Sequence, residues 1–298
     1  MHHAGRGRVQ RQEGTMIGPD RFARFTAEAA VPEQVPDYVC AVAGSKPRLF
    51  ESCVGYVSEE STVLVGYPLH DPRDEGAMAD AVEQALKTPG LGRLTVIGPA
   101  RPPQAPASVL ERRDEYFALT LPPSPSPKLR NLLRRAGREL TLDRGRALLD
   151  DHMALAQRYL DGRTLEAGTR HIFRQMGNYV EASAGALVVS ARRSDGKLAA
   201  FAIGEFGSLS TAFFMFCFRD PALAPPGSAD LTLSGLLEEA HERGQTRMNL
   251  GLGISDSIRF FKCKWGGTPF LPYVEVSWEP GSLGVFSKVR GMLRRKRS

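Results

Sequence analysis

The stretch Arg247–Tyr273, RMNLGLGISDSIRFFKCKWGGTPFLPY, decides the fold that we expect for this chain. Its first seven residues predict a β-strand, ISDSIRFFKCKWGG predicts a short helix that ends at Gly266 and Gly267, and PFLPYVEVSW predicts a further strand. Strands and helices that alternate in this way are typical of an α/β protein. Ligands of such proteins commonly bind where a strand ends, so this stretch is also a candidate for the functional site.

The residues before this stretch continue the alternation. The segment PGSADLTLSGLLEEAHERG predicts a helix, and the almost wholly apolar run STAFFMFCFRD predicts a central strand that is buried on both faces. Asp195-Gly196 between two alternating runs predicts a hairpin, and RALLDDHMALAQRYLDG and LEAGTRHIFRQMGNYVEA each predict one helix. We therefore expect the second half to run helix, helix, three strands, helix, strand, helix, strand.

The first half predicts a shorter, strand-rich version of the same plan. RLFESCVGYV (48–57) and STVLVGYPL (61–69) predict one strand each, an amphipathic helix follows from Asp74, and RLTVIGP and EYFALTLP predict two more strands. KLRNLLRRAGREL then predicts an amphipathic helix on which Arg130, Arg134 and Arg138 form a basic stripe. The stripe suits either an ordinary solvated helix face or a phosphate-rich partner.

Length and composition exclude several classes of protein. The chain has 298 residues, of which 42% are hydrophobic and 24% charged, as is usual for globular proteins, and this length corresponds to about two domains. Its 4 cysteines form no C-x-x-C pair, so the sequence indicates neither a zinc site nor a disulfide framework. The motifs of P-loop, zinc-protease and α/β-hydrolase enzymes are also missing from the sequence. We expect no metal site.

The two ends of the chain differ from its body. The net charge is +6, and the six basic side chains within Lys288–Ser298 equal that whole excess. We expect a basic C-terminal tail at residues 281–298, either solvated or in contact with anionic lipid or nucleic acid, and a disordered extension at residues 1–20, with Met16 a candidate start. No apolar run reaches 18 residues, so no transmembrane helix is expected. The expected location is the cytoplasm, with peripheral membrane contact through the tail.

The pattern strand, glycine, polar turn, RFFKCKWGG, strand resembles the C-terminal end of Fem-type aminoacyltransferases and of phosphatidylglycerol lysyltransferases. Both belong to the GNAT-like acyltransferase superfamily. The core of the resemblance is F-K-x-x-[FW]-G, here Phe261, Lys262, Trp265 and Gly266, and a weaker likeness extends over about residues 35–275. It implies an α/β (α+β) fold of two tandem GNAT-like lobes, each with a mixed, mostly antiparallel sheet flanked by helices.

The resemblance also implies a domain organisation and an activity. It places an N-terminal lobe at residues 21–140 and a catalytic C-terminal lobe at residues 141–280, and we expect the active cleft between them, built mainly by the C-terminal lobe. The implied protein is an acyltransferase that moves an aminoacyl or acyl group to an amine or hydroxyl on a small-molecule, peptide or lipid-linked acceptor. The alternatives are an acyl-CoA-dependent GNAT N-acyltransferase and a non-catalytic binding protein with the same fold.

The expected donor is aminoacyl-tRNA or acyl-CoA, with no tightly bound cofactor. Acyl-CoA members of the superfamily normally carry a [RQ]-x-x-G-x-[GA] turn, whose backbone N–H groups and following helix hold the pyrophosphate. The corresponding stretch RDPALAPPGSADLTLSG has Arg219 without those glycines, and Pro225 and Pro226 lack N–H donors. This departure favours aminoacyl-tRNA, and the basic stripe with Arg130 and Arg134 fits tRNA as a polyanionic partner.

Lys262 is the predicted catalytic cation. Arg259 lies three residues before it on the short helix, and a pair of cations there suits a phosphate or a developing oxyanion. Phe261 and Trp265 share a helix face, which indicates core anchors that also form one wall of the cleft. A backbone N–H of the strand Ala212–Phe218 is expected to polarise the acyl carbonyl.

Three carboxylates are candidates for removing the proton of the acceptor. Glu205 interrupts an apolar strand and is either exposed or aimed into the cleft. Asp230 and Asp256 lie at the starts of helices, where capping the helix is the alternative role. Glu205 and Asp230 join Lys262 as the predicted catalytic residues. The predicted substrate-binding residues are Arg259, Asp256, Phe261, Trp265, Arg130 and Arg134.

Overall fold

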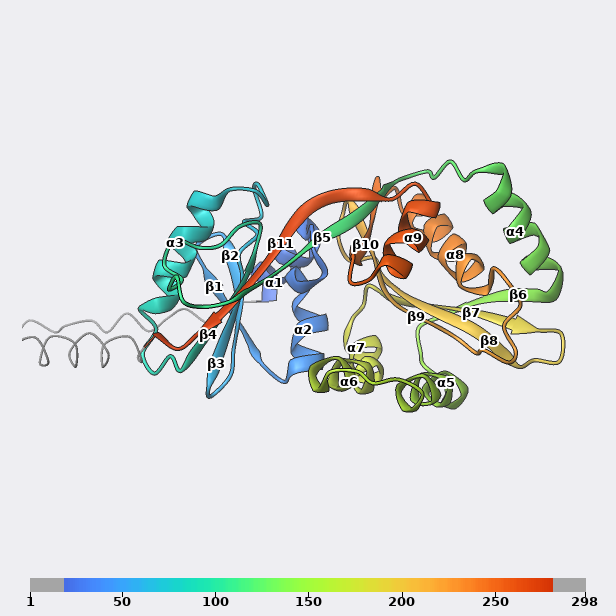
Figure 1. Ribbon diagram of the computed structural model, residues 1–298, viewed down its shortest axis with the longest axis horizontal. Helices are drawn as coiled ribbons and strands as arrows, with labels where there is room; N and C mark the ends of the chain where they lie inside the picture. Colours follow the sequence, from blue (N-terminus) through green and yellow to red (C-terminus); the bar gives the residue numbers. More distant parts are fainter. Residues whose placement is uncertain (1–18, 281–298) are drawn as a thin grey trace, which may run out of the picture.

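One continuous eleven-stranded sheet runs through the protein and carries helices on both faces (Figure 1). The structure is a computed structural model that describes residues 19–280. The expected tail at residues 281–298, and all but the last two residues of the expected extension at 1–20, lie outside the described residues.

The strands and helices agree in order with most of the sequence-based expectations. The strands are β1 (Lys46–Phe50), β2 (Cys53–Val57), β3 (Ser61–Val65), β4 (Arg93–Gly98), β5 (Glu111–Thr120), β6 (Leu140–Gly145), β7 (Ala186–Arg193), β8 (Leu198–Glu205), β9 (Thr211–Arg219), β10 (Arg247–Leu252) and β11 (Thr268–Trp278). The helices are α1 (Pro19–Glu28), the 3-10 helix η1 (Pro32–Gln34), α2 (Pro36–Ala43), α3 (Glu75–Leu86), α4 (Pro127–Glu139), α5 (Asp150–Asp161), α6 (Ala167–Arg174), α7 (Met176–Ala182), α8 (Ser228–Glu242) and α9 (Asp256–Lys264).

The two halves of the chain exchange their last strands. The sheet order is β1-β2-β3-β4-β11-β5-β10-β9-β8-β7-β6. In each half a set of antiparallel strands, β1–β3 and β6–β9, is followed by a helical crossover to a parallel strand, through α3 to β4 and through α8 to β10. β5 from the first half then pairs with β10, β11 from the second half pairs with β4, and β5 and β11 pair with each other. The predicted mixed, mostly antiparallel architecture is confirmed. The sheet continues across residues 140/141, where we expected a boundary between two lobes, and that boundary stays a prediction.

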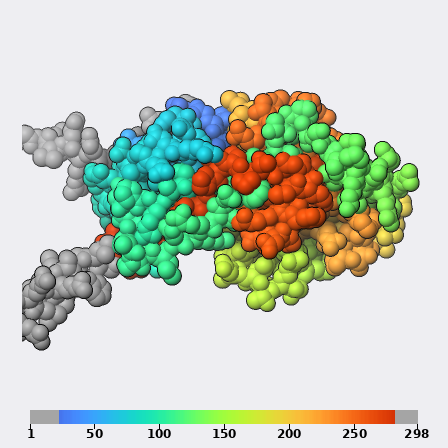
Figure 2. Space-filling model, turned by 45° about the horizontal axis from the view of Figure 1, so that its top comes forward, coloured from blue at the N-terminus to red at the C-terminus, as the bar shows by residue number. Residues whose placement is uncertain are grey.

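The helices of the second half cover opposite faces of the sheet. On one face α4 and α8 pack on β7–β9, with Leu129, Val189 and Leu236 in a shared apolar core. A Cβ on Gly227, just before α8, would lie 2.9 Å from Leu132 of α4, so the two helices meet closely at that end. The other face carries α2, α5 and α7. Figure 2 shows the region of α9 and β11 at the middle of the visible surface, between the two ends of the molecule.

Three details of the expected secondary structure are wrong. The segment 48–57 is two strands, because the chain turns at Glu51, whose φ is 49°. The segment expected as one helix is broken at Gln175 into α6 and α7, and this break brings Met176 into the core. The residues after Leu140 form the strand β6, which is largely exposed at the edge of the sheet and therefore lacks an apolar pattern.

Candidate functional site

The candidate site is built around a gap between the parallel strands β9 and β10. Their pairing covers three positions and ends at Asn249↔Phe213, although β9 continues to Arg219. The side chain of Asn249 accepts a hydrogen bond from Gly251 N at 2.7 Å, and Gly251 has φ of 78°, so β10 bulges at this point while pairing with β5. In the first half, β3 and β4 pair over five positions. The gap is therefore a feature of the second half.

Beyond the gap, β9 contains a bulge of its own. Ile203 of β8 faces Phe216 and Gly204 faces Phe214, so Met215 is an extra residue in β9. A bulge leaves the backbone groups of the extra residue outside the regular ladder. Met215 lies within Ala212–Phe218, the strand from which we expected a backbone N–H to polarise the acyl carbonyl. An N–H in a bulge beside an open strand edge suits that task.

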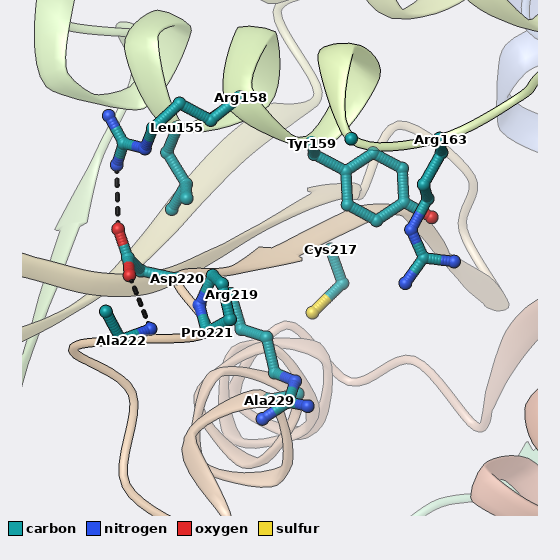
Figure 3. A pocket seen from close by; sticks show the side chains of 11 residues that line it. Leu155, Arg158, Tyr159, Arg163, Cys217, Arg219, Asp220, Pro221, Ala222 and Ala229 are labelled. Carbon is teal, nitrogen blue, oxygen red and sulfur yellow. Dashed lines mark hydrogen bonds and ion pairs between the residues drawn. The ribbon is translucent and has the colours of Figure 1, made fainter.

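A cleft of about 600 Å³ lies at the C-terminal end of β9 (Figure 3). Helix α5 forms one side and the start of α8 the other, and Cys217 points its sulfur into the space between them. Burial raises the pKa of the Cys217 thiol to about 11, so the thiol is a poor nucleophile at neutral pH. The lining residues are Leu155, Arg158, Tyr159, Gly162, Arg163, Cys217, Arg219, Asp220, Pro221, Ala222 and Ala229.

Three arginines give the cleft a positive character. Arg158 donates a hydrogen bond to Asp220 at 2.8 Å, whereas Arg163 lies over the ring of Tyr159 at 4.4 Å. Arg219 extends from the end of β9 toward Ala229 at the start of α8 (Figure 3). Within residues 19–280, neither Arg163 nor Arg219 forms an ion pair. Both guanidinium groups are exposed and suit an anionic ligand.

Lys262 lies on α9, just past the end of β10, as expected. Its side chain is buried, and Nζ donates a hydrogen bond to the carbonyl oxygen of Leu252, the last residue of β10. Burial, together with the nearby charge of Arg259, lowers the pKa of Lys262 to about 7, against an opposing effect of Asp114. An amine that titrates near neutral pH is typical of functional sites.

Arg259 projects beside Lys262, as predicted, but it already has a carboxylate partner. Its guanidinium donates to Asp114 at 2.8 Å, and both Arg259 and Lys262 lie over the ring of Phe117, at 5.8 and 5.6 Å from its centroid. The side chain of Asp114 is almost fully buried, which makes this pair part of the framework that orients α9. The substrate-binding role of Arg259 stays a prediction.

Phe261, Trp265 and Asp230 connect α9 to the other elements around the gap. Phe261 stacks on Phe214 of β9, with ring centroids 6.3 Å apart. Trp265 is buried, and its indole N–H donates to Asp230 at 2.9 Å, while Lys264 forms an ion pair with the same carboxylate at 2.6 Å. Asp230 therefore ties the start of α8 to the end of α9. Its predicted catalytic role stays a prediction.

Glu205 is fully buried at the end of β8. One carboxylate oxygen accepts hydrogen bonds from Tyr179 at 2.8 Å and Ser183 at 2.6 Å. The other accepts the backbone N–H groups of Phe206 at 3.1 Å and Gly207 at 2.9 Å. These four bonds fit a carboxylate that holds the turn after β8, and its predicted role as a base stays a prediction.

The remaining predicted residues lie on the surface. Asp256 is exposed in the first turn of α9, where Ser255 is the residue that caps the helix. Arg130 and Arg134 are exposed on α4 and bond only locally among the described residues, to Pro125 and Asn131. The structure thus brings Lys262, Arg259, Phe261, Trp265 and Asp230 together and leaves the basic stripe on a separate helix.

Two parts of the site were missed by the sequence analysis. Arg158 and Arg163 occur in an ordinary amphipathic helix and the turn after it, and only the fold brings them opposite Arg219. Glu33 of η1 accepts a hydrogen bond from the buried Tyr116 at 2.8 Å, and burial raises its pKa. Tyr116 pairs with Leu252, whose carbonyl oxygen accepts the hydrogen bond from Lys262. Lys262 itself lies over Phe117, which follows Tyr116 in β5 and packs in a different core cluster, so Glu33 and Lys262 approach this strand end from opposite faces of the sheet.

Within residues 19–280, no group of three or more histidine, cysteine, aspartate or glutamate side chains could hold a metal ion. In the same part of the chain, none of the helices has the length and apolar character that a membrane span needs.

Most of the residues that form this site match a known protein domain. Residues 127–261 match the family model of the acetyltransferase (GNAT) domain. This range includes α5, the gap between β9 and β10, the cleft and most of α9. The chain carries a GNAT acetyltransferase domain, and the class of protein that it defines is an acyltransferase. No curated protein sequence matches the chain.

Solved structures with the same fold cover almost the whole described chain. A conserved protein of unknown function from Bacteroides thetaiotaomicron aligns with a TM-score of 0.62 and 12% identity over 88% of this chain and 98% of its own. FemX aligns with a TM-score of 0.61 and 10% identity over 88% and 97%. The C-terminal domain (DUF2156) assigned to a lysylphosphatidylglycerol synthetase of Agrobacterium fabrum aligns with a TM-score of 0.57 and 17% identity over 86% and 90%. At these identities the likeness concerns the fold.

Proposed function

We propose that the protein transfers an aminoacyl group from aminoacyl-tRNA to an amine or hydroxyl acceptor. The observation that carries this proposal is the cleft beside the open edge of β9. It has exposed arginines to receive phosphates, while the backbone N–H groups of Ala222, Leu223 and Ala224 in the loop between β9 and α8 already donate to Asp220. FemX and the lysylphosphatidylglycerol synthetase domain, which share the fold, support a donor of this kind.

The reaction needs a carbonyl to be polarised and a proton to be removed. The acceptor nitrogen or oxygen attacks the acyl carbonyl carbon, the ester bond to the ribose oxygen of the tRNA breaks, and that oxygen takes up a proton. In our proposal the Met215 backbone N–H and the protonated Lys262 stabilise the negative charge that develops on the carbonyl oxygen. Glu33, whose pKa is raised by burial, accepts the proton that leaves the acceptor.

The basic stripe of α4 supports a donor that is larger than the cleft. Arg130, Arg134 and Arg138 are exposed on a helix that packs against α8, the helix whose start borders the cleft. A tRNA whose acylated end enters the cleft has further phosphates to neutralise outside it. Exposed arginines on a neighbouring helix provide such contacts.

A second candidate function is acyl transfer from acyl-CoA. The match to the acetyltransferase (GNAT) domain favours it, as does the position of Ala229, which places the first turn of α8 at the cleft. The start of a helix attracts phosphate groups. This candidate requires the diphosphate of CoA to bind next to Asp220.

The two donors are separated by measuring binding and transfer on the purified chain. Thermal unfolding is followed with and without acetyl-CoA, because a ligand at 100 times its Kd stabilises a protein by about 2.7 kcal/mol. Radiolabelled aminoacyl-tRNA and acetyl-CoA are then each incubated with the protein and with lipid, peptide and amino-sugar acceptors. We expect label to move from aminoacyl-tRNA and no shift with acetyl-CoA. A dose-dependent shift together with transfer from acetyl-CoA alone would overturn the proposal.

A further inference from the structure

The loop between β9 and α8 carries an anion of its own. The carboxylate oxygen Oδ1 of Asp220 accepts the backbone N–H groups of Ala222 at 2.8 Å and Leu223 at 3.1 Å. The carbonyl oxygen of the same residue accepts the N–H of Ala224 at 3.0 Å. The next two residues, Pro225 and Pro226, have no N–H to offer. Asp220 and the prolines therefore account for every backbone donor between Pro221 and Gly227.

The Asp220 carboxylate is also held in its charged form. Its second oxygen accepts a hydrogen bond from Arg158 at 2.8 Å, and its residue is 6% exposed. Burial alone would raise the pKa of Asp220, but the hydrogen bonds from Ala222 and Arg158 keep it below its ordinary value. The negative charge thus persists at neutral pH, and it neutralises one of the three arginines that line the cleft.

A bound diphosphate would need the loop N–H groups that already donate to Asp220. Consecutive backbone N–H groups in a loop before a helix are the usual donors to a pyrophosphate, which packs two charged groups into a small volume. In this cleft such a group would compete with a resident carboxylate for the same N–H groups and would be repelled by its charge. Arg163 and Arg219, which have no carboxylate partner among the described residues, remain available to phosphates that are further apart.

We propose that Asp220 is a specificity determinant that excludes diphosphate-bearing donors such as acyl-CoA from this cleft and leaves it to donors with separated phosphodiesters. This inference rests on the proposed function, because it explains why a GNAT domain would use aminoacyl-tRNA. Asp220 excludes a diphosphate because its carboxylate already occupies the position in the loop at which a phosphate group would bind.

The test measures binding of acetyl-CoA and of inorganic pyrophosphate by isothermal titration calorimetry. The full chain is compared with Asp220→Asn, which removes the charge but keeps an oxygen for the loop N–H groups, and with Asp220→Ala, which also frees those groups. Asp161→Asn on α5 is the matched control, because it removes an exposed negative charge near the cleft. Circular dichroism melts establish that each variant is folded, and Asp220→Asn carries the test if Asp220→Ala is not.

We expect the wild-type protein and Asp161→Asn to bind both probes weakly, with Kd above about 1 mM. Asp220→Asn should bind each probe at least about tenfold more tightly, since it removes a charge at contact distance. Folded Asp220→Ala should bind more tightly still. Equal affinity of the wild-type protein and folded Asp220→Asn for acetyl-CoA would overturn the proposal, whether that affinity is high or low.

The fate of this proposal can be separated from that of the proposed function. Transfer from aminoacyl-tRNA by the wild-type protein tests the donor directly and does not involve the variants. If that transfer fails while Asp220→Asn gains affinity for acetyl-CoA, Asp220 excludes diphosphates but the assigned donor is wrong. If transfer succeeds and the variants gain nothing, the donor stands and Asp220 is not the determinant.

Discussion

At Lys262, the positive charge that the proposed transfer reaction needs lowers the stability of the folded protein. Its ammonium group is buried next to the positive charge of Arg259, and within residues 19–280 it has no ion-pair partner. Burying an unpaired charge costs stability, and a hydrophobic residue of similar size often restores it. We predict that Lys262→Met unfolds at a higher temperature than the wild-type protein at pH 7, by about 1 kcal/mol or more in stability, and loses about 100-fold or more in transfer rate.

The pH dependence of this effect follows from the pKa of about 7, which lies below the ordinary value of 10.5. Between these two values the unfolded chain binds more protons than the folded one, so wild-type stability rises with pH in this window. The advantage of Lys262→Met should therefore shrink from pH 7 to pH 10. Denaturant titrations at several pH values measure it, with the exposed Lys87→Met as control. A less stable Lys262→Met at pH 7 contradicts the prediction.

The cluster of His152, Ser190 and Asp151 has the composition of a catalytic triad but the wrong geometry. The Nε2 of His152 lies 2.7 Å from the Ser190 hydroxyl, and its Nδ1 lies 3.3 Å from Asp151. However, the backbone N–H of Leu149 donates to that Nδ1 at 3.0 Å. A nitrogen that accepts this bond has no proton to share with Asp151, so the imidazole caps α5 and does not activate a nucleophile.

At the scale of elements, α4 divides its two faces between packing and charge. Leu129 and Ala136 are buried, while Arg130 and Arg134 face solvent. Because the arginines contribute little to packing, reversing their charge should leave the unfolding temperature nearly unchanged. We predict that Arg130→Glu/Arg134→Glu lowers the affinity for aminoacyl-tRNA by about tenfold or more at low salt and reduces the salt dependence of binding.

Filter binding of labelled aminoacyl-tRNA at several salt concentrations measures this loss. Lys46→Glu/Lys87→Glu is the matched control, because it makes the same change of net charge at exposed positions of the first half. If the α4 variant binds aminoacyl-tRNA with wild-type affinity and an unchanged salt dependence, α4 is not part of the interface. This conclusion holds whatever the control variant does.

Most elements of this fold were predictable because their signals are local. The helix at α8, the hairpin between β7 and β8 and the short helix at α9 each follow from apolar periodicity and from glycine or proline at the ends. β6 was not predictable, because an edge strand with a mostly exposed surface needs no apolar residues. The break at Gln175 was also hidden, because both helices that flank it continue one amphipathic pattern.

At the scale of the whole molecule, the exchange of β5 and β11 makes each half depend on the other. Without the second half, β4 loses its partner β11 and β5 loses β10. We predict that residues 1–121 and 122–298, expressed separately, lack cooperative unfolding and sharp near-ultraviolet circular dichroism, whereas co-expressed fragments purify as one complex. The physical reason is that each fragment alone exposes long unpaired strand edges with apolar faces.

A cleaved full chain provides the control. A protease site inserted in the loop 122–126, between β5 and α4, allows the two halves to be cut after folding. Gel filtration should then find both fragments together in buffer and apart only in denaturant. Independent, cooperative melting of either fragment would mean that the halves are autonomous domains.

The order of most strands and helices from residue 46 onward, and the placement of Lys262 just past a strand, were determined by the sequence alone, because helix and strand periodicities and their terminating residues act over a few positions. The tertiary structure decided where the site is. Arg158 and Asp220 are 62 residues apart and meet across the cleft, and Lys262 becomes buried only when α9 packs against Phe117 of the first half's last strand. Such contacts depend on the exchange of strands between the halves, and no local pattern in the chain encodes that pairing.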